Sequence, residues 1–286
     1  MKAFRIGLGM MMAAMLLLGI CLAPAGAEEL RVVTTQDKSG EGKKYRELVE
    51  YLDKKGIDMN FEAARDYVSA AELFSKGGVD AMFSGSGIAG IMIMKGLAEP
   101  LVRPVAKDGT STYWAVVIAK KGSPKFTGSA DYFKGKKVIL TSMASSGEIY
   151  LHHLPGAAKA AAEIKKAATH AAALDALNTG VADIAIVKNR VWDAEKGKYP
   201  GLEQVGQDKS ENPDGTLIVS KKMKQETRNK IAAVLTGLKN DPAPEAAVVR
   251  NSLGIQGYIP TKNEDFKHTL NLLKEAGVTK DFKFKF

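Results

Sequence analysis

Cysteine is almost absent from this chain of 286 residues, and aromatic residues make up only 7% of it. The single cysteine, Cys21, lies in an apolar N-terminal segment, so the rest of the chain has neither disulfides nor thiol chemistry available. Neither HExxH nor GxSxG occurs, and His152 and His153 are adjacent instead of one helical turn apart. The sequence therefore argues against an enzyme, and we expect neither a metal nor a cofactor.

The N-terminal segment has the pattern of a secretory signal peptide. Two basic residues precede an apolar stretch at 6–22, and the small residues at 25–27 suit a cleavage site. We predict that residues 1–27 are a signal peptide and that the protein is exported. A retained membrane anchor is one alternative, although the stretch is short for a spanning helix. Lipid attachment at Cys21 is a lesser alternative because the bulky Ile20 precedes it.

The chain carries an excess of positive charge. Lysine and arginine outnumber aspartate and glutamate by 41 to 32, which gives a formal net charge of +9. Such an excess suits an anionic ligand or a negatively charged membrane surface. We expect no nucleic acid partner, because the lysines are spread along the chain without an aromatic-rich basic stripe and the signal peptide directs the protein away from the genome.

Apolar runs typical of buried strands alternate with segments of helical spacing, which predicts an α/β fold. One unit occurs twice, at 69–83 and at 171–187: a helical pattern, a glycine stop, a valine and an aspartate, then a buried strand. The repeat indicates two lobes built on one plan, with a chance similarity of common turn chemistry as the alternative. We expect further strands at 30–35, 57–61, 113–119, 138–140 and 216–219, helices at 45–52, 227–238, 245–253 and 266–275, and loops at 241–244 and 257–260.

A serine-rich turn follows the predicted strand at 138–140. Residues 144–147, Ala-Ser-Ser-Gly, lead into a helical pattern, and hydroxyls beside the free N–H groups of a helix start can bind an anion. The alternative is that Ser145 or Ser146 merely caps the helix. A second Ser/Gly turn at 84–87 also joins a strand to a helical pattern, but it matches neither GxGxxG nor GxxxxGK[ST], so we expect no nucleotide site.

The order of these motifs resembles that of a known family, the phosphate/phosphite/phosphonate-type solute-binding proteins of ABC importers. The motifs that carry the resemblance are Tyr67-Val68-Ser69-Ala70, Gly78-Val79-Asp80, Ser84 to Gly87, Tyr113-Trp114-Ala115-Val116, Lys134-Gly135-Lys136-Lys137 and Ser145-Ser146-Gly147. The resemblance implies a type 2 periplasmic binding protein fold, in which two α/β lobes joined by two crossover hinge strands clamp a ligand. Lobe 1 would comprise residues 28–115 and 216–286, and lobe 2 residues 116–215.

The resemblance also implies ligand-binding residues. Ser145, Ser146 and Gly147 would hold the oxyanion, with Ala144 in place of the family's first serine. The family's pattern adds three further residues: Tyr113 on the crossover strand, Tyr67 at the start of a helix, and His170 ahead of the second repeat helix. The other Ser/Gly turn would contribute Ser84 and Ser86. The alternative for each tyrosine is an ordinary half-buried aromatic residue without a ligand contact. The alternative for His170 is a surface residue or a residue that caps the helix.

One position departs from the family's pattern. Of the two acidic residues that hold the amine of an aminoalkylphosphonate, one corresponds to Asp214, whereas Arg190 stands near the other. An arginine would repel an ammonium group and could pair with a second anionic group, which argues against an aminoalkylphosphonate. The alternative is that Arg190 is a surface residue paired with Asp193 or Asp214.

The sequence therefore favours a monomeric periplasmic binding protein that captures a small phosphorus oxyanion for an ABC permease. A second hypothesis keeps the fold but makes the protein a sensor that partners a membrane receptor or kinase and binds a different ligand. An enzyme ranks last.

Overall fold

A computed structural model describes residues 29–34, 45–62, 64, 66–141 and 144–284. The predicted signal peptide, its cleavage site and Cys21 lie outside the described residues. None of the described helices combines the length and the apolar character needed to cross a bilayer.

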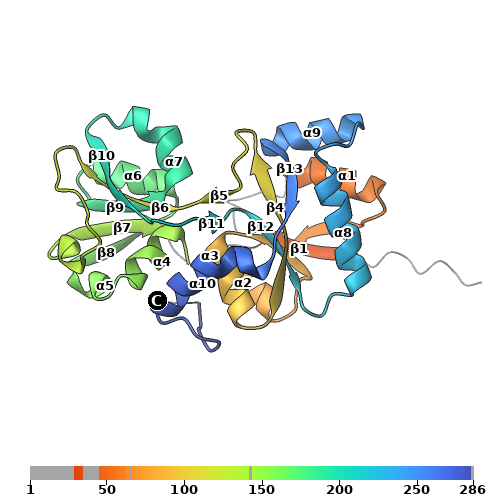
Figure 1. The fold of residues 1–286 in the computed structure, drawn as a ribbon, viewed down its shortest axis with the longest axis horizontal. Coiled ribbons are helices and arrows are strands. Elements are labelled where there is room, and N and C mark those ends of the chain that lie inside the picture. Colours follow the sequence, from red (N-terminus) through yellow and green to blue (C-terminus); the bar gives the residue numbers. More distant parts are fainter. Residues whose placement is uncertain (1–28, 35–44, 63, 65, 142–143, 285–286) are drawn as a thin grey trace, which may run out of the picture.

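A mixed sheet forms the centre of lobe 1 (Figure 1). Its strand order is β13-β4-β12-β3-β1-β2. The neighbouring pairs β1–β2 and β1–β3 are parallel, and the other neighbouring pairs are antiparallel. The strands are β1 Leu30–Thr34, β2 Met59–Glu62, β3 Ala81–Ser84, β4 Ala98–Ala106, β12 Thr216–Ser220 and β13 Ile255–Pro260. The helices are α1 Arg46–Lys54, α2 Tyr67–Ser75, α3 Ser86–Met94, α8 Gln225–Gly237, α9 Pro244–Leu253 and α10 Lys267–Glu275, with the 3₁₀ turn Asn263–Phe266 before α10.

A second sheet, in the order β10-β6-β9-β7-β8, forms the centre of lobe 2. Its strands are β6 Ala115–Lys120, β7 Lys137–Thr141, β8 Glu163–Ala167, β9 Ile184–Lys188 and β10 Leu202–Gln207. Its helices are α4 Ser146–His153, α5 Ala157–Ala160, α6 His170–Asn178 and α7 Asn189–Glu195, with 3₁₀ turns at Ala130–Phe133 and Lys196–Lys198.

Two short antiparallel strands join the lobes. They are β5 Thr112–Tyr113 and β11 Asn212–Pro213, and they lie between the two sheets in Figure 1. The predicted architecture, two α/β lobes with two crossover strands, is confirmed. The residue boundaries of the lobes stay a prediction.

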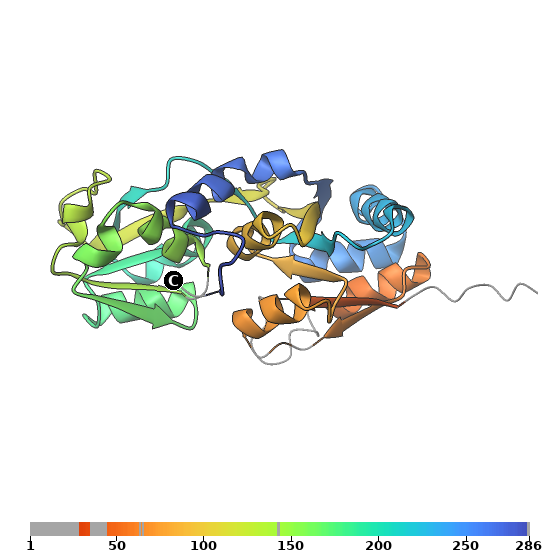
Figure 2. The ribbon, with the colours of Figure 1, turned by 90° about the horizontal axis from the view of Figure 1, so that it is seen from below.

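Each sheet is covered on both faces, which explains the continuous apolar runs in the sequence. Successive residues of a strand point to opposite faces, so Val32 packs with Leu48 of α1 while Val33 packs with Ile91 of α3. In lobe 2 the neighbouring residues Ile139 and Leu140 of β7 likewise point to opposite faces, and each belongs to a different hydrophobic core. Figure 2 shows the helices on either side of both sheets.

The repeat seen in the sequence is structural. In each copy a helix leads to a strand that runs parallel to its neighbour: α2 to β3 beside β1, and α6 to β9 beside β7. The repeated aspartate makes the same kind of contact in both copies, a hydrogen bond from a backbone N–H near the start of the neighbouring strand. Asp80 accepts the N–H of Arg31 at 3.1 Å, and Asp183 accepts that of Lys137 at 2.8 Å. Both aspartates therefore hold the neighbouring strand near its start.

Two expectations about elements were wrong. Residues 257–260 form part of β13, an edge strand paired with β4, and not a loop. The predicted strand at 113–119 is divided, since β5 ends at Tyr113 and β6 starts at Ala115, where the chain passes from the hinge into the second sheet. Trp114 lies between them and donates its backbone N–H to Asn189 Oδ1 at 3.0 Å.

Candidate functional site

The start of α3 brings the first Ser/Gly turn to the hinge. Ser84 ends β3, and its fully buried hydroxyl donates to the carbonyl of Gly85 at 2.9 Å. Ser86 is the first residue of α3, and its hydroxyl bonds to the hydroxyl of Tyr113 on the hinge strand β5. The turn of lobe 1 and the hinge are thus joined by a buried hydrogen bond.

The two serines at the start of α4 differ in their contacts. Ser145 is the N-cap: its hydroxyl accepts the N–H of Glu148 at 3.2 Å and donates to the carbonyl of Thr141 at 2.5 Å. Ser146 is the first residue of the helix and is 9% exposed, and its hydroxyl has no hydrogen-bond partner among the residues that the structure describes. The capping alternative therefore describes Ser145, whereas Ser146 has an unused hydrogen-bonding group at a helix N-terminus.

The two helix starts meet where the lobes touch. A Cβ atom on Gly87 would lie 1.9 Å from the carbonyl oxygen of Ala144, so only glycine permits this approach of α3 to the serine turn of lobe 2. Gly147 is constrained in the same way, because its Cβ would lie 2.3 Å from the carbonyl oxygen of Ile186 in β9. Both glycines serve close packing at the helix starts.

A chain of charged groups continues from Tyr113 at the hinge. The ammonium of Lys188, the last residue of β9, lies 4.4 Å from the centre of the Tyr113 ring and 2.5 Å from Asp214 Oδ1. Burial raises the pKa of Tyr113, so its hydroxyl stays protonated and can donate. One connected group thus joins residues that lie far apart in the sequence. We call it the hinge cluster; its members are Ser86, Tyr113, Lys188 and Asp214.

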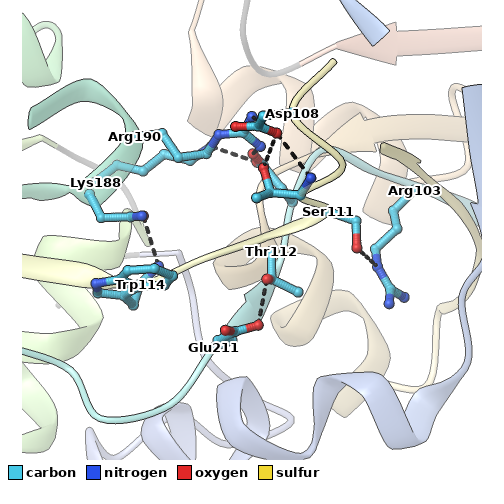
Figure 3. Close-up of polar contacts among 11 residues, drawn as sticks. Arg103, Asp108, Ser111, Thr112, Trp114, Lys188, Arg190 and Glu211 are labelled. Atoms are coloured by element: carbon cyan, nitrogen blue, oxygen red, sulfur yellow. Dashed lines mark hydrogen bonds and ion pairs between the residues drawn. The ribbon is translucent and has the colours of Figure 1, made fainter. Parts of the chain in front are cut away.

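Arg190 extends the hinge cluster at the start of α7. Its guanidinium lies 3.3 Å from Asp214 Oδ2 and 3.8 Å from Asp108 Oδ1. Figure 3 shows Arg190 pointing toward Asp108, near the hinge residues Thr112 and Trp114. Asp214 is therefore shared by two cations from lobe 2, and the predicted alternative partner Asp193 pairs instead with Lys196 at 2.9 Å.

His170 lies at the start of α6 beside Lys188. Its Nδ1 accepts the backbone N–H of Lys188 at 3.4 Å, which places the proton of the neutral ring on Nε2. Burial, followed by the nearby charge of Lys188, lowers the pKa of His170 to about 4. The ring is therefore neutral at pH 7 and can donate one hydrogen bond from Nε2.

Tyr67 takes a different position from the other predicted residues. It is the first residue of α2, after the capping Asp66, and it packs half-buried on the core of lobe 1 that also contains Ala144. Its role as a ligand contact stays a prediction.

Sequence reasoning missed three residues of this region: Lys188, Glu148 and Lys166. Lys188 directly follows the second repeat strand, at the end of a parallel strand where ligand groups gather. Glu148 completes a Ser-x-x-Glu capping pattern with Ser145, a signal that was present in the sequence. Its buried carboxylate accepts the N–H of Ala144 at 2.6 Å and pairs with Lys166.

Two surface cavities lie on lobe 1, away from this region. One, of about 430 Å³, is lined by Lys107, Arg250 and Gln256; the other, of about 750 Å³, by Asp58, Lys76 and Lys230 among others. Within the described ranges, no group of three or more histidine, cysteine, aspartate or glutamate side chains could hold a metal ion. Of the adjacent histidines, His153 pairs with Glu275 of α10 at 2.8 Å.

Comparison with known proteins identifies a family. Residues 30–266 match the model described as "ABC transporter, phosphonate, periplasmic substrate-binding protein". None of the curated protein sequences compared with the chain matches it.

Solved structures share the fold. The Xanthomonas citri protein XAC2383, solved with ATP, is 16% identical with a TM-score of 0.73, over 87% of this chain and 97% of that one. PhnD1 from Prochlorococcus marinus, in complex with methylphosphonate, is 13% identical with a TM-score of 0.68, over 87% and 98%. A binding protein component of an ABC phosphonate transporter from Pseudomonas aeruginosa is 16% identical with a TM-score of 0.65, over 83% of each chain.

Proposed function

Since the chain belongs to the family of periplasmic substrate-binding proteins of phosphonate ABC transporters, we propose that it captures phosphate, phosphite or a small phosphonate between its lobes. Proteins of this family bind substrates for transport and are not enzymes. The family implies a periplasmic location and a permease partner. We further propose that residues 1–27 are the export signal, that the protein acts as a monomer, and that it binds no nucleic acid.

The observation that carries the proposal is the unpartnered hydroxyl of Ser146. A buried hydroxyl without a partner costs free energy, about 1–3 kcal/mol, which a ligand oxygen would recover. The hydroxyl lies at the N-terminus of α4, where free N–H groups and the helix dipole attract an anion. The start of α3 meets the same turn from lobe 1, so an oxyanion there would contact both lobes.

The hinge cluster supports a choice among phosphorus oxyanions. Asp214 is neutralised by Lys188 and Arg190, so it is poorly suited to receive the ammonium of an aminoalkylphosphonate. Methylphosphonate, the ligand in the Prochlorococcus structure, has no such group. We propose a ligand without an amine, held by Ser146, Gly147, His170 Nε2–H and the hydroxyls of Tyr113 and Ser86, with Ser84, Ser145 and Tyr67 around it.

Binding would act by closing the lobes. An oxyanion that contacts both helix starts has a higher affinity for the arrangement in which they meet, and it raises the population of that arrangement by the difference in affinity. The permease would then recognise the closed form. No covalent step is needed.

A thermal-shift panel tests the proposal. The mature protein is heated with phosphate, phosphite, methylphosphonate, 2-aminoethylphosphonate, a carboxyphosphonate, sulfate and several amino acids. A ligand at about 100-fold excess over its Kd adds about 2.7 kcal/mol of stability, so a shift with a phosphorus oxyanion and none with 2-aminoethylphosphonate is expected. No shift with any phosphorus oxyanion would contradict the proposal and favour a sensor with another ligand.

A further inference from the structure

Glu148 places a negative charge where the proposed ligand would bind. It is the third residue of α4 and is 4% exposed. One carboxylate oxygen accepts the N–H of Ala144 at 2.6 Å, and the other pairs with Lys166. The carboxylate thus already occupies one backbone donor beside the serine turn.

Lys166 supplies the opposing charge from a different element. It lies on the edge strand β8, and its side chain is 39% exposed, so water screens part of its charge. Glu148, with a side chain that is only 5% exposed, is screened less. The pair therefore combines a buried negative charge next to the helix start with a partly solvated positive charge behind it.

The start of α4 also carries an independent mark of a ligand. Ser146 is nine-tenths buried, and its hydroxyl has no partner in the described part of the chain. Ser146 and Glu148 belong to the same first turn, so a bound oxyanion and the Glu148 carboxylate would share one helix end.

We propose that the Glu148–Lys166 pair sets the affinity of the site for oxyanions through its charge, a proposal that rests on the function proposed above. Glu148 lowers the affinity because it repels the ligand and occupies the Ala144 N–H. Lys166 raises the affinity because it compensates Glu148. Glu148 and Lys166 are thereby affinity-determining positions, and Glu148 acts from the same turn as Ala144.

Capping alone does not require the charge. Glutamine serves as well as glutamate in a capping box, so Glu148→Gln keeps an acceptor for the Ala144 N–H and removes only the charge. If Glu148 is only a cap, this variant leaves oxyanion affinity unchanged. If Glu148 acts through its charge, the variant binds oxyanions more tightly.

The experiment measures the Kd of phosphite and of methylphosphonate by titration calorimetry at pH 7 and low salt. The variants are Glu148→Gln and Lys166→Gln, and far-UV circular dichroism confirms that each is folded. We expect roughly tenfold tighter binding for Glu148→Gln and roughly tenfold weaker binding for Lys166→Gln, and both shifts shrink at high salt.

A neighbouring ion pair gives the matched control. Glu163 and Lys165 pair at 3.0 Å on the same strand β8, and both are partly exposed. Glu163→Gln and Lys165→Gln change the net charge of the protein equally, and we expect them to leave the Kd unchanged.

The two proposals fail in different ways. If the wild type binds a probe but the two variants do not shift its Kd in opposite directions, the charge proposal is overturned while the function stands. If neither the wild type nor any variant binds either probe, the proposed function itself is contradicted.

Discussion

Ser145 and Ser146 are neighbours with opposite hydrogen-bonding states. The Ser145 hydroxyl makes two hydrogen bonds within the protein, whereas the Ser146 hydroxyl makes none with any residue that the structure describes. Substitution of Ser145 therefore tests the stability of the fold, and substitution of Ser146 tests ligand binding.

We expect Ser146→Ala to weaken phosphorus oxyanion binding by about 1–3 kcal/mol, because a hydrogen bond to a charged ligand is lost. The same change leaves the free energy of unfolding of the unliganded protein unchanged or higher, since it removes a buried unpaired hydroxyl. Ser145→Ala, the control, lowers that free energy by about 1 kcal/mol through loss of the cap. Calorimetry and urea unfolding measure the two effects; undiminished affinity in Ser146→Ala would place the anion elsewhere.

His170 makes stability depend on pH. Its pKa is about 4 in the folded protein and near 6.5 in the unfolded chain, so the unfolded chain binds more protons between these values. Stability therefore falls as pH decreases from about 6.5 to about 4, by a His170 contribution of order 2 kcal/mol. Urea unfolding of His170→Asn across this range should show a shallower acid loss than the wild type. An identical slope would contradict a neutral, partly buried imidazole in the folded protein.

Arg190 is expected to disfavour the binding of a phosphonate that carries an amine. We expect Arg190→Glu to gain binding of 2-aminoethylphosphonate, because the change frees Asp214 from one of its two cations and adds a carboxylate nearby. Thermal shift with this ligand measures the gain. Lys196→Glu, at a residue that pairs with Asp193 on the surface, is the charge-matched control and should show none.

Among the helices, the starts of α3 and α4 form one contact between the lobes. Gly87→Ala would put a methyl group against the Ala144 carbonyl and oppose closure at a cost of about 1–3 kcal/mol, so ligand affinity falls. Gly85, two residues earlier, has nothing within 4 Å of a Cβ, and Gly85→Ala should bind normally. Calorimetry on the pair checks the prediction, and equal affinities would mean that the lobes do not close at this contact.

Elements with a clear period could be predicted from the sequence. The repeat, the serine turn leading into α4, and most helices of lobe 1 followed from apolar spacing and caps. β4 gives no clear strand pattern because Pro100 and Pro104 interrupt it. Its partner β13 contains Gly257 and Pro260, which are typical of a loop.

The candidate site was only partly predictable because its contacts cross between elements. Lys166 reaches Glu148 only because β8 pairs with β7, and Lys188 reaches Asp214 across the hinge. Neither pairing leaves a periodic signal in the sequence. The serine turn, by contrast, is local. The family resemblance supplied four further residues, of which three contact Lys188 and the fourth, Arg190, joins them through Asp214; the other two are Tyr113 and His170.

At the scale of the whole molecule, α10 links the lobes in addition to the hinge. It follows β13 of lobe 1, yet it packs against both α3 and α4, and it lies beyond the residues matched by the family model (Figure 1). His268 bonds to Asp208 at 2.8 Å, and Thr269 donates to Asn212 of the hinge at 2.6 Å. The lobe arrangement in the structure therefore has contacts of its own besides the hinge, and a ligand that favours this arrangement adds to them.

A crystal structure of the protein grown with methylphosphonate or phosphite would show whether a phosphorus oxyanion binds between the start of α4 and the hinge. We expect ligand oxygens within hydrogen-bond distance of the hydroxyls of Ser146 and Tyr113, with Gly87 still against Ala144. A ligand in the cavity beside Lys76 and Lys230, or a complex that leaves the Ser146 hydroxyl without a partner, would contradict it.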